Sequence, residues 1–430
     1  MPMRKTPGHT APRQSGCDCD DTADLEQMLS VQQGVDLAVS LVAPIADMHD
    51  APIIDAVGQS LAQDVLAPAE MPFFDNSAMD GFAVRCADFT GSSPWTFPLG
   101  AQVAAGATMP GALRAACVDR IFTGAPLPAG SDAVVMVEKT RETPDGIRFD
   151  SAPDPGDNIR PKGSDIKAGA CLIRAGTRLA PHHVGLLAAN GVGHVPLRRA
   201  PRVGVLSTGD EVTETQREDG QIYDANRPML CALARAAGAQ VSDLGILPDD
   251  AAQSAQRLAE AARQFDLVLT SGAVSMGGHD FLRPALVAAG GTVEGWRVTL
   301  KPGKPVMFAR LGSCVVTGLP GNPLAVLVGF HLFVAAQLRR LAGRDARAFA
   351  AVPARAGFSW QRKPGRDEVF PVRLSHYSDA GLPVLIRLGQ GVSGTLVPVA
   401  QADGLGYVAG TVADVQPGDA LRWQPFADRP

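Results

Sequence analysis

The sequence has few aromatic residues, little net charge and no evident membrane segment, and its number of cysteines is odd. Aromatic residues make up 5% of the 430 residues, and the formal net charge is −5. A weakly acidic chain is not expected to bind nucleic acid through bulk charge. We find no apolar run that approaches the ~18–20 residues of a membrane helix. Residues 1–24 also lack the apolar core of a signal peptide. The seven cysteines fit reduced thiols, so we expect a cytoplasmic protein with no membrane and no nucleic-acid partner.

Several catalytic signatures are missing as well. We find no convincing GxGxxG, Walker, HExxH or GxSxG motif, which argues against a standard nucleotide-binding or triad enzyme. Cys17-Asp18-Cys19 has no second ligand pair at the spacing of a zinc site, so we interpret residues 1–24 as a disordered tail. His182-His183 follows Pro181 and is interpreted as the start of a helix.

The length and composition are those of a large globular chain. At ~100–200 residues per domain, the sequence predicts about two to four domains. Its 46% hydrophobic and 19% charged residues are typical of soluble proteins. The 46 glycines and 34 prolines indicate many turns and favour small barrels.

The region from Val203 to Val326 predicts an α/β domain with a parallel sheet. Three apolar runs lead into polar, glycine-rich loops, and helical patterns lie between them. The loops are Ser207–Glu211, Thr270–Asp280 and Thr317–Pro323. In a parallel sheet such loops meet at one edge, where ligands bind. Each loop alone could be an ordinary turn, but the three together predict a site.

The flanking regions predict smaller domains. Residues 25–47 show helical spacing, with Ser30 as N-cap and Pro44 near the end. Residues 82–160 alternate short apolar runs with turns, which predicts a small β-barrel or sandwich. From about residue 347 the pattern is again β-like, and Leu396–Val399 is one of the expected strands. Further helices are expected over 181–190, 250–264 and 324–341.

Two segments carry unusual polar groups. Lys301-Pro302-Gly303-Lys304-Pro305 places two lysines on a stiff loop, which fits an oxyanion or phosphate site as well as it fits simple solvated charge. Residues 71–85 contain many turn-forming side chains and could form either a buried capped loop or part of a site. Asp224 or Asn226 is expected to cap the helix that contains Pro228, and a helix also begins at Pro323.

Six motifs in order resemble one enzyme family, over residues 28 to 425. They are Phe74–Ala83, Thr123–Pro126, Ser207–Glu211, Gly220–Asn226, Lys301–Pro305 and Gly318–Pro323. The set resembles that of the molybdopterin molybdenumtransferases, which are related to the E domain of gephyrin.

The resemblance implies a function and an architecture. Members of the family take molybdate and adenylylated molybdopterin, use Mg²⁺, insert molybdenum and release AMP. They are homodimers whose site is shared between chains, and the adenylyltransferase and recipient molybdoenzymes are further candidate partners. The implied domains are the tail 1–24, a discontinuous mixed domain 25–74 plus 163–199, a β domain 75–162, the α/β domain 200–346 and a β-barrel-like domain 347–430.

The resemblance also assigns roles to individual residues by matching motif. The implied catalytic positions are Asp80, Thr123, Asp165, Glu211, Asp249 and Asp280. The implied substrate-binding positions are Gly272, Ser275, Gly277, Arg297, Lys301, Lys304, Pro320, Asn322, Pro323, Arg366 and Ser393. Glu211 and Asp280 are the expected Mg²⁺ ligands, because carboxylates that share a cleft repel one another unless a cation lies between them.

Two positions depart from the family pattern. Ala273 stands where the family usually has glycine, and Gly278 stands where it often has an acid. These changes keep a second hypothesis open, that of a catalytically weakened paralogue that binds or scaffolds the cofactor. A third hypothesis is molybdopterin adenylyltransferase, which resembles the α/β domain alone.

Overall fold

The structure is a computed structural model that describes residues 28–106, 108–272, 281–346, 351–389 and 394–426. The chain forms two compact units. Unit 1 comprises Met1–Asp47 with Arg199–Pro430, and unit 2 is Met48–Arg198.

A six-stranded mixed sheet forms the centre of unit 1, in the order β17-β14-β18-β22-β21-β19. The strands are β14 (Arg202–Thr208), β17 (Gln240–Leu247), β18 (Leu267–Ser271), β19 (Thr292–Trp296), β21 (Met307–Leu311) and β22 (Cys314–Leu319). The four strands β17, β14, β18 and β22 are parallel, as expected. The prediction of a parallel sheet did not include β21, which runs antiparallel to both of its neighbours, β22 and β19. Only Gly312 and Ser313 join β21 to β22, and so short a turn can only reverse the chain.

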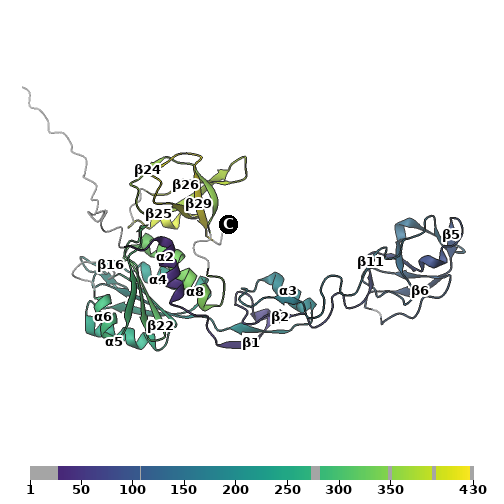
Figure 1. The fold of residues 1–430 in the computed structure, drawn as a ribbon, viewed down its shortest axis with the longest axis horizontal. Helices are drawn as coiled ribbons and strands as arrows, with labels where there is room; N and C mark the ends of the chain where they lie inside the picture. Colours follow the sequence, from purple (N-terminus) through teal and green to yellow (C-terminus); the bar gives the residue numbers. More distant parts are fainter. Residues whose placement is uncertain (1–27, 107, 273–280, 347–350, 390–393, 427–430) are drawn as a thin grey trace, which may run out of the picture. The chain divides into compact units, whose positions relative to one another are not determined.

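Helices cover both faces of this sheet (Figure 1). They are α2 (Val31–Ser40), α4 (Asn226–Ala236), α5 (Ala251–Ala262), α6 (Leu282–Ala288), α7 (Pro323–Gly329) and α8 (Ala335–Leu341), with a π-helical turn η4 (Phe330–Val334) between the last two. Helices α2, α4, α7 and α8 share one apolar core with the sheet, and α5 and α6 share the other. Because both faces are covered, the polar loops at the strand ends remain the accessible part of the sheet.

Helix α2 is shorter than predicted. Ser30 caps it as expected, since its hydroxyl accepts from Gln33 N at 3.1 Å. The helix ends at Ser40, before Pro44, which cannot donate a helical hydrogen bond and disfavours helix at the preceding residue. It packs into the core of unit 1 rather than with residues 48–74.

The helical stretch Pro323–Leu341 is long and apolar enough to cross a membrane by length and composition alone. Its mean hydropathy is 1.5, so the expectation that no run approaches this length was wrong. In the structure 78% of this stretch is buried inside the fold. It is a core helix of unit 1.

The C-terminal part of unit 1 is a small barrel. Strand β25 pairs with both β26 and β27, so the order β25-β26-β23-β29-β27 closes on itself, and β20 adds to β25. The strands are β20 (Leu300–Lys301), β23 (Val352–Ala356), β25 (Asp367–Tyr377), β26 (Pro383–Arg387), β27 (Gly404–Val408) and β29 (Ala420–Pro425), with the separate pair β24 (Trp360–Gln361) and β28 (Asp414–Val415). The expected strand Leu396–Val399 was wrong, because the chain forms helix α9 (Val397–Ala400) there. Pro398 lacks the N–H of a strand ladder but suits the first turn of a helix.

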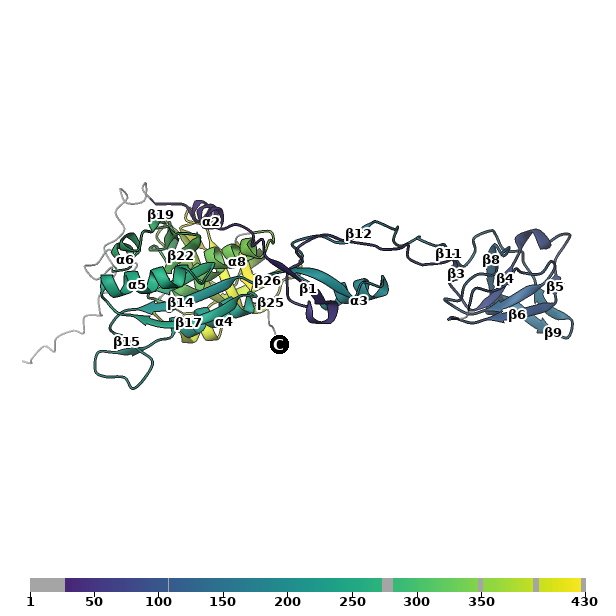
Figure 2. The same cartoon turned by 90° about the horizontal axis from the view of Figure 1, so that it is seen from below.

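Unit 2, whose strands and helix Figure 2 shows, has its own apolar cores. One core lies among β1 (Met48–Pro52), β2 (Val65–Leu66), β12 (Cys171–Ile173), α3 (Pro181–Ala189) and β13 (His194–Arg198). The β-rich remainder comprises β3 (Asn76–Ser77), β4 (Gly81–Val84), β5 (Trp95–Phe97), β6 (Leu99–Val103), β7 (Val118–Ile121), β8 (Ala133–Met136), β9 (Thr140–Thr143), β10 (Gly146–Phe149) and β11 (Ile159–Arg160). His182 and His183 begin α3 as predicted, and His183 Nδ1 accepts from Ala180 N at 2.9 Å.

Candidate active site

The loops after three neighbouring parallel strands of unit 1 are joined by hydrogen bonds. Thr208 at the end of β14 donates to the carbonyl of Ser271 at 3.1 Å, and the Ser271 hydroxyl donates to the carbonyl of Pro320 at 3.3 Å. Gly272 N donates to the carbonyl of Leu319 at 3.1 Å. The predicted convergence of these loops at one sheet edge is confirmed.

Asn226 ties a fourth segment to this edge. Its side-chain amide donates to Ser271 Oγ at 2.8 Å and to the carbonyl of Gly321 at 2.7 Å. Asp224 caps the helix beside it by accepting from Asn226 N and Arg227 N, both at 3.1 Å. The sequence predicted a capping role here but missed the contacts that Asn226 makes across the site.

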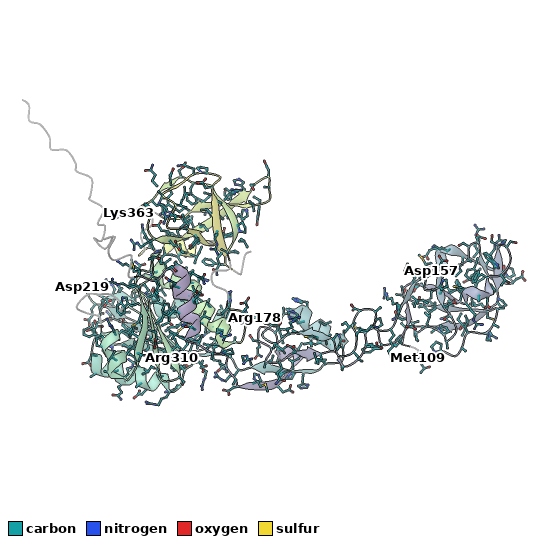
Figure 3. All side chains as sticks on the ribbon, in the orientation of Figure 1. Met109, Asp157, Arg178, Asp219, Arg310 and Lys363 are labelled. Carbon is teal, nitrogen blue, oxygen red and sulfur yellow. The ribbon has the colours of Figure 1, made fainter. Side chains whose placement is uncertain are left out.

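A small cavity of about 100 Å³ opens at the sheet edge, and we call it the edge pocket. It is lined by Ser207, Thr208, Glu211, Val212, Ile222, Tyr223, Asp224, Ala225, Asn226, Ser271, Gly272, Gly321 and Pro323. Within the described part of the chain, Ser207 Oγ and Asn226 Oδ1 are buried and have no hydrogen-bond partner. The pocket thus combines a carboxylate with unsatisfied polar oxygens. Beside it, the exposed segment that carries Asp219 joins β15 (Val212–Thr213) to β16 (Ile222–Tyr223) (Figure 3).

Gly272 is required at its position by the backbone. Its φ is +95°, a conformation that side chains disfavour. A Cβ atom there would lie 2.5 Å from Thr208 Oγ1 and 2.8 Å from Thr208 O. Two neighbouring strand ends can therefore approach this closely only with glycine.

A second, larger cavity of about 440 Å³ is lined by several cationic side chains, and we call it the cation pocket. Its polar and aromatic lining includes Lys301, Lys304, Asn322, Trp360, Arg366, Glu368 and Arg387, and Pro320 also lines it. The sequence predicted Lys301, Lys304, Pro320, Asn322 and Arg366 as substrate-binding residues, and the structure brings all five to this cavity. The sequence did not predict the other two charged residues of this cavity, Glu368 and Arg387, which come from the C-terminal barrel.

The orientation of Lys301 depends on a buried carboxylate. Strand β20 pairs with β25 so that Lys301 lies opposite Glu368, and Lys301 Nζ is 2.8 Å from Glu368 Oε1. The other carboxylate oxygen is 3.2 Å from Nε of Arg362. Arg362 is itself fixed by donating to the carbonyls of Ala409 at 2.6 Å and Arg366 at 2.5 Å. One buried ion pair thus supports a pocket lysine and the backbone of a pocket arginine.

A single loop separates the two cavities. Pro320 and Asn322 line the cation pocket, whereas Gly321 and Pro323 line the edge pocket. Pro323 occupies the first turn of α7, where proline loses no hydrogen bond. A substrate with two chemically different ends could use both sides of this loop.

In unit 2, two of the predicted motifs meet. Asp80 Oδ1 accepts from both N and Oγ1 of Thr123, each at 2.7 Å. These hydrogen bonds, the backbone one first, hold the pKa of the Asp80 carboxyl below its ordinary value. Both residues are exposed, so the charged carboxylate is presented to solvent. Asp165 is also exposed and its N–H donates to the carbonyl of Met71 at 3.1 Å.

Comparison with known proteins decides the family. Residues 29–191 match the MoeA N-terminal region (domain I and II), residues 204–340 a probable molybdopterin binding domain, and residues 353–426 the MoeA C-terminal region (domain IV). The molybdopterin molybdenumtransferase of Haemophilus influenzae is 40% identical over 293 residues, which cover 67% of this chain and 72% of the relative. The chain belongs to the molybdopterin molybdenumtransferase family. The predicted family and enzyme class are confirmed.

A second curated relative and a solved structure agree with this assignment. Molybdopterin molybdenumtransferase 2 of Mycobacterium tuberculosis is 38% identical over 302 residues, which cover 68% of this chain and 75% of the relative. The crystal structure of the molybdopterin biosynthesis MoeA protein from Pyrococcus horikoshii OT3 is 26% identical, with a TM-score of 0.80. That match covers 93% of this chain and all of the solved chain (100%).

Of the remaining positions that the resemblance implies, Asp249 and Arg297 lie within the described residues and the others do not. Asp249 N donates to the side chain of Asp210, the residue before Glu211, at 3.3 Å, while its neighbour Asp250 caps α5. Arg297 follows β19 with a left-handed φ of 69°. Ser275, Gly277, Asp280 and Ser393 lie outside the described residues, as do Ala273 and Gly278. No described contact joins Asp165 to the Asp80–Thr123 pair.

The resemblance implies Mg²⁺, and the edge pocket can be examined for donor atoms that suit this ion. Glu211, Ser207 Oγ and Asn226 Oδ1 supply only oxygen atoms, which is the donor type that Mg²⁺ prefers. Among the described residues no group of three or more His, Cys, Asp or Glu could hold a metal ion. The donor chemistry therefore fits Mg²⁺. Two carboxylates line the pocket, and because Asp224 is paired with Arg227 at 3.0 Å, Glu211 is the better candidate for a cation ligand.

Proposed function

We propose that this chain transfers molybdenum from molybdate to adenylylated molybdopterin and releases AMP, the final step of molybdenum cofactor synthesis. The observation that carries the proposal is the cation pocket. In a chain of this family, Lys301 and Lys304 line a cavity that shares the Pro320–Pro323 loop with the edge pocket. An oxyanion and an adenylylated pterin could therefore meet across one loop.

The cation pocket is the proposed site for molybdate. Lys301, Lys304 and Arg366 supply positive charge and N–H donors that suit a tetrahedral dianion. We propose that Arg297 and Ser393 contribute to the same anion. Because Glu368 holds Lys301 at 2.8 Å, the ammonium group is oriented before the anion arrives.

The sheet edge is the proposed site for the pyrophosphate and pterin of the other substrate. The Gly277 backbone and Ser275 would receive the phosphates. Gly272, whose N–H donates to the carbonyl of Leu319, would hold the start of the same loop close to them. Asn322 and Pro323 present the start of α7. Glu211 and Asp280 are the proposed Mg²⁺ ligands, with Asp249 nearby. The bound cation would neutralise phosphate charge.

The unit 2 residues Asp80, Thr123 and Asp165 are proposed to complete the site across a homodimer. Their exposure supports this, because exposed side chains are accessible to a second chain. The division into domains 1–24, 25–74 plus 163–199, 75–162, 200–346 and 347–430 remains a prediction. A cytoplasmic location is supported by the described cysteines, all of which are free thiols.

The test is AMP release from adenylylated molybdopterin by the purified chain, with and without molybdate and Mg²⁺. We expect release that requires both. Tight binding of the adenylate without release would favour a scaffold, and consumption of ATP with molybdopterin would favour an adenylyltransferase. The matches over residues 29–191 and 353–426 lie outside the α/β domain, which disfavours the latter.

A further inference from the structure

Arg387 ends strand β26 and lines the cation pocket, and it has no role assigned so far. Its guanidinium carbon lies 3.8 Å from the centroid of the Trp360 ring and 6.0 Å from that of Phe370. At the shorter distance the planar cation rests on the indole face. The stack restricts the side chain, so its N–H groups are held in a fixed plane.

One donor of Arg387 is not used by the part of the chain that the structure describes. Within the described residues, its Nε is shielded from solvent and has no hydrogen-bond partner. Burial lowers the pKa of the Arg387 guanidinium, and attraction to Glu368 opposes that shift. A shielded charged donor without an acceptor is costly, and an acceptor that enters the cavity removes the cost.

Glu368 does not supply that acceptor. Its Oε1 is paired with Lys301 at 2.8 Å and its Oε2 with Arg362 at 3.2 Å. The second arginine near the Trp360 ring, Arg362, is 5.8 Å from the centroid but already donates to backbone carbonyls. The two arginines therefore differ: Arg362 bonds to the barrel backbone, whereas Arg387 lines the cavity and its Nε has no acceptor among the described residues.

We propose that Arg387 binds a tetrahedral oxyanion of the substrate in the cation pocket, beside Lys301. A guanidinium can donate two parallel hydrogen bonds to two oxygens of one anion, which an ammonium cannot do. The inference rests on the proposed function. The oxyanion is either molybdate or the phosphate of the adenylylated substrate, and these share the chemistry that Arg387 recognises.

The experiment compares Arg387→Met and Arg387→Lys with the unchanged chain by titration calorimetry. Sodium molybdate and AMP are titrated separately. Methionine keeps the apolar contact with Trp360 but removes the charge, and lysine keeps the charge without the planar fork. Arg373→Met is the matched control, because Arg373 is an exposed arginine of the adjoining strand β25. Melting curves of all variants check folding, and the lysine variant covers the case in which the methionine variant is unstable.

We expect Arg387→Met to weaken one of the two anions by about tenfold or more, as for a lost hydrogen bond to a charged group. Arg387→Lys should give a smaller loss, and Arg373→Met should bind as the unchanged chain does. Loss for molybdate alone identifies molybdate as the ligand, and loss for AMP alone identifies the phosphate. If the unchanged chain binds both anions and releases AMP while the Arg387 variants bind equally well, the inference fails and the proposed function stands. If the unchanged chain binds neither anion, both fail.

Discussion

Replacing Glu368 with glutamine should destabilise unit 1 measurably. The Glu368 side chain is 5% exposed and that of its partner Arg362 is 1% exposed. Breaking a buried ion pair from one side costs about 3–5 kcal/mol. Arg362 keeps its bonds to backbone carbonyls, and the glutamine oxygen can still accept one hydrogen bond. We therefore expect a loss of about 2–3 kcal/mol, which corresponds to a decrease in melting temperature of about 4–10 °C.

The assay must separate the two units, because a chain with two units need not unfold in one step. Trp296, Trp360 and Trp423 lie in unit 1, whereas Trp95 lies in unit 2. Urea and thermal unfolding followed by tryptophan fluorescence in a Trp95→Phe background would then report unit 1.

Two control variants complete this test. Lys301→Met should cost less than Glu368→Gln, because the carboxylate keeps Arg362 and Lys301 is 48% exposed. Asp47→Asn removes a 72% exposed carboxylate of unit 1 that pairs with Arg199 and should cost less than about 1 kcal/mol, because Arg199 keeps its pair with Asp266. The buried pair does not have the role assigned to it if Glu368→Gln melts at the same temperature as the unchanged chain. The same conclusion follows if Lys301→Met lowers the free energy of unfolding as much as Glu368→Gln does.

Three further outcomes are expected. Thr123→Val should raise the pKa of Asp80 toward its ordinary value, so the loss of AMP release at acid pH should begin at a higher pH, and an unchanged pH profile would contradict the proposed role. Gly272→Ala should cost about 2 kcal/mol or more because its Cβ would clash, whereas Gly220→Ala, with a similar φ of +88° and open space, should cost less by urea unfolding. Burial lowers the pKa of His331 from 6.5 to about 4. As the pH falls from 6.5 to about 4, His331 therefore takes up a proton in the unfolded chain but stays neutral in the folded chain. The free energy of unfolding should then fall by roughly 1.4 kcal/mol per pH unit, and His331→Gln should remove this slope.

The elements of the site that follow from strand topology could be predicted from the sequence. Polar loops after Thr208, Ser271 and Leu319 had to meet at one edge once their strands were parallel, and hydrogen bonds join them there. Lys301 and Lys304 were identified because Pro and Gly stiffen the loop that carries them. These inferences depend on neighbouring residues in the chain or on a general rule of sheets.

The parts that the sequence did not reveal depend on contacts between distant segments. Glu368 and Arg387 join the cation pocket only because β20 pairs with β25 and the barrel closes. Asn226 was interpreted as a cap, but its amide bridges Ser271 and Gly321, and no local pattern encodes that contact. The prediction of a strand at Leu396–Val399 was wrong because it relied on the apolar spacing and gave too little weight to Pro398, which suits the first turn of a helix.

The most direct test of the central claim is the transfer of molybdenum itself. Purified chain is incubated with adenylylated molybdopterin, molybdate and Mg²⁺, and the molybdenum bound to the released pterin is measured by mass spectrometry together with AMP. We predict equal amounts of both products from the unchanged chain and from Lys363→Met, whose exposed lysine lies outside the cation pocket, and a severe loss of both from Lys301→Met. Molybdenum transfer by Lys301→Met at the rate of the unchanged chain would contradict the assignment of the cation pocket.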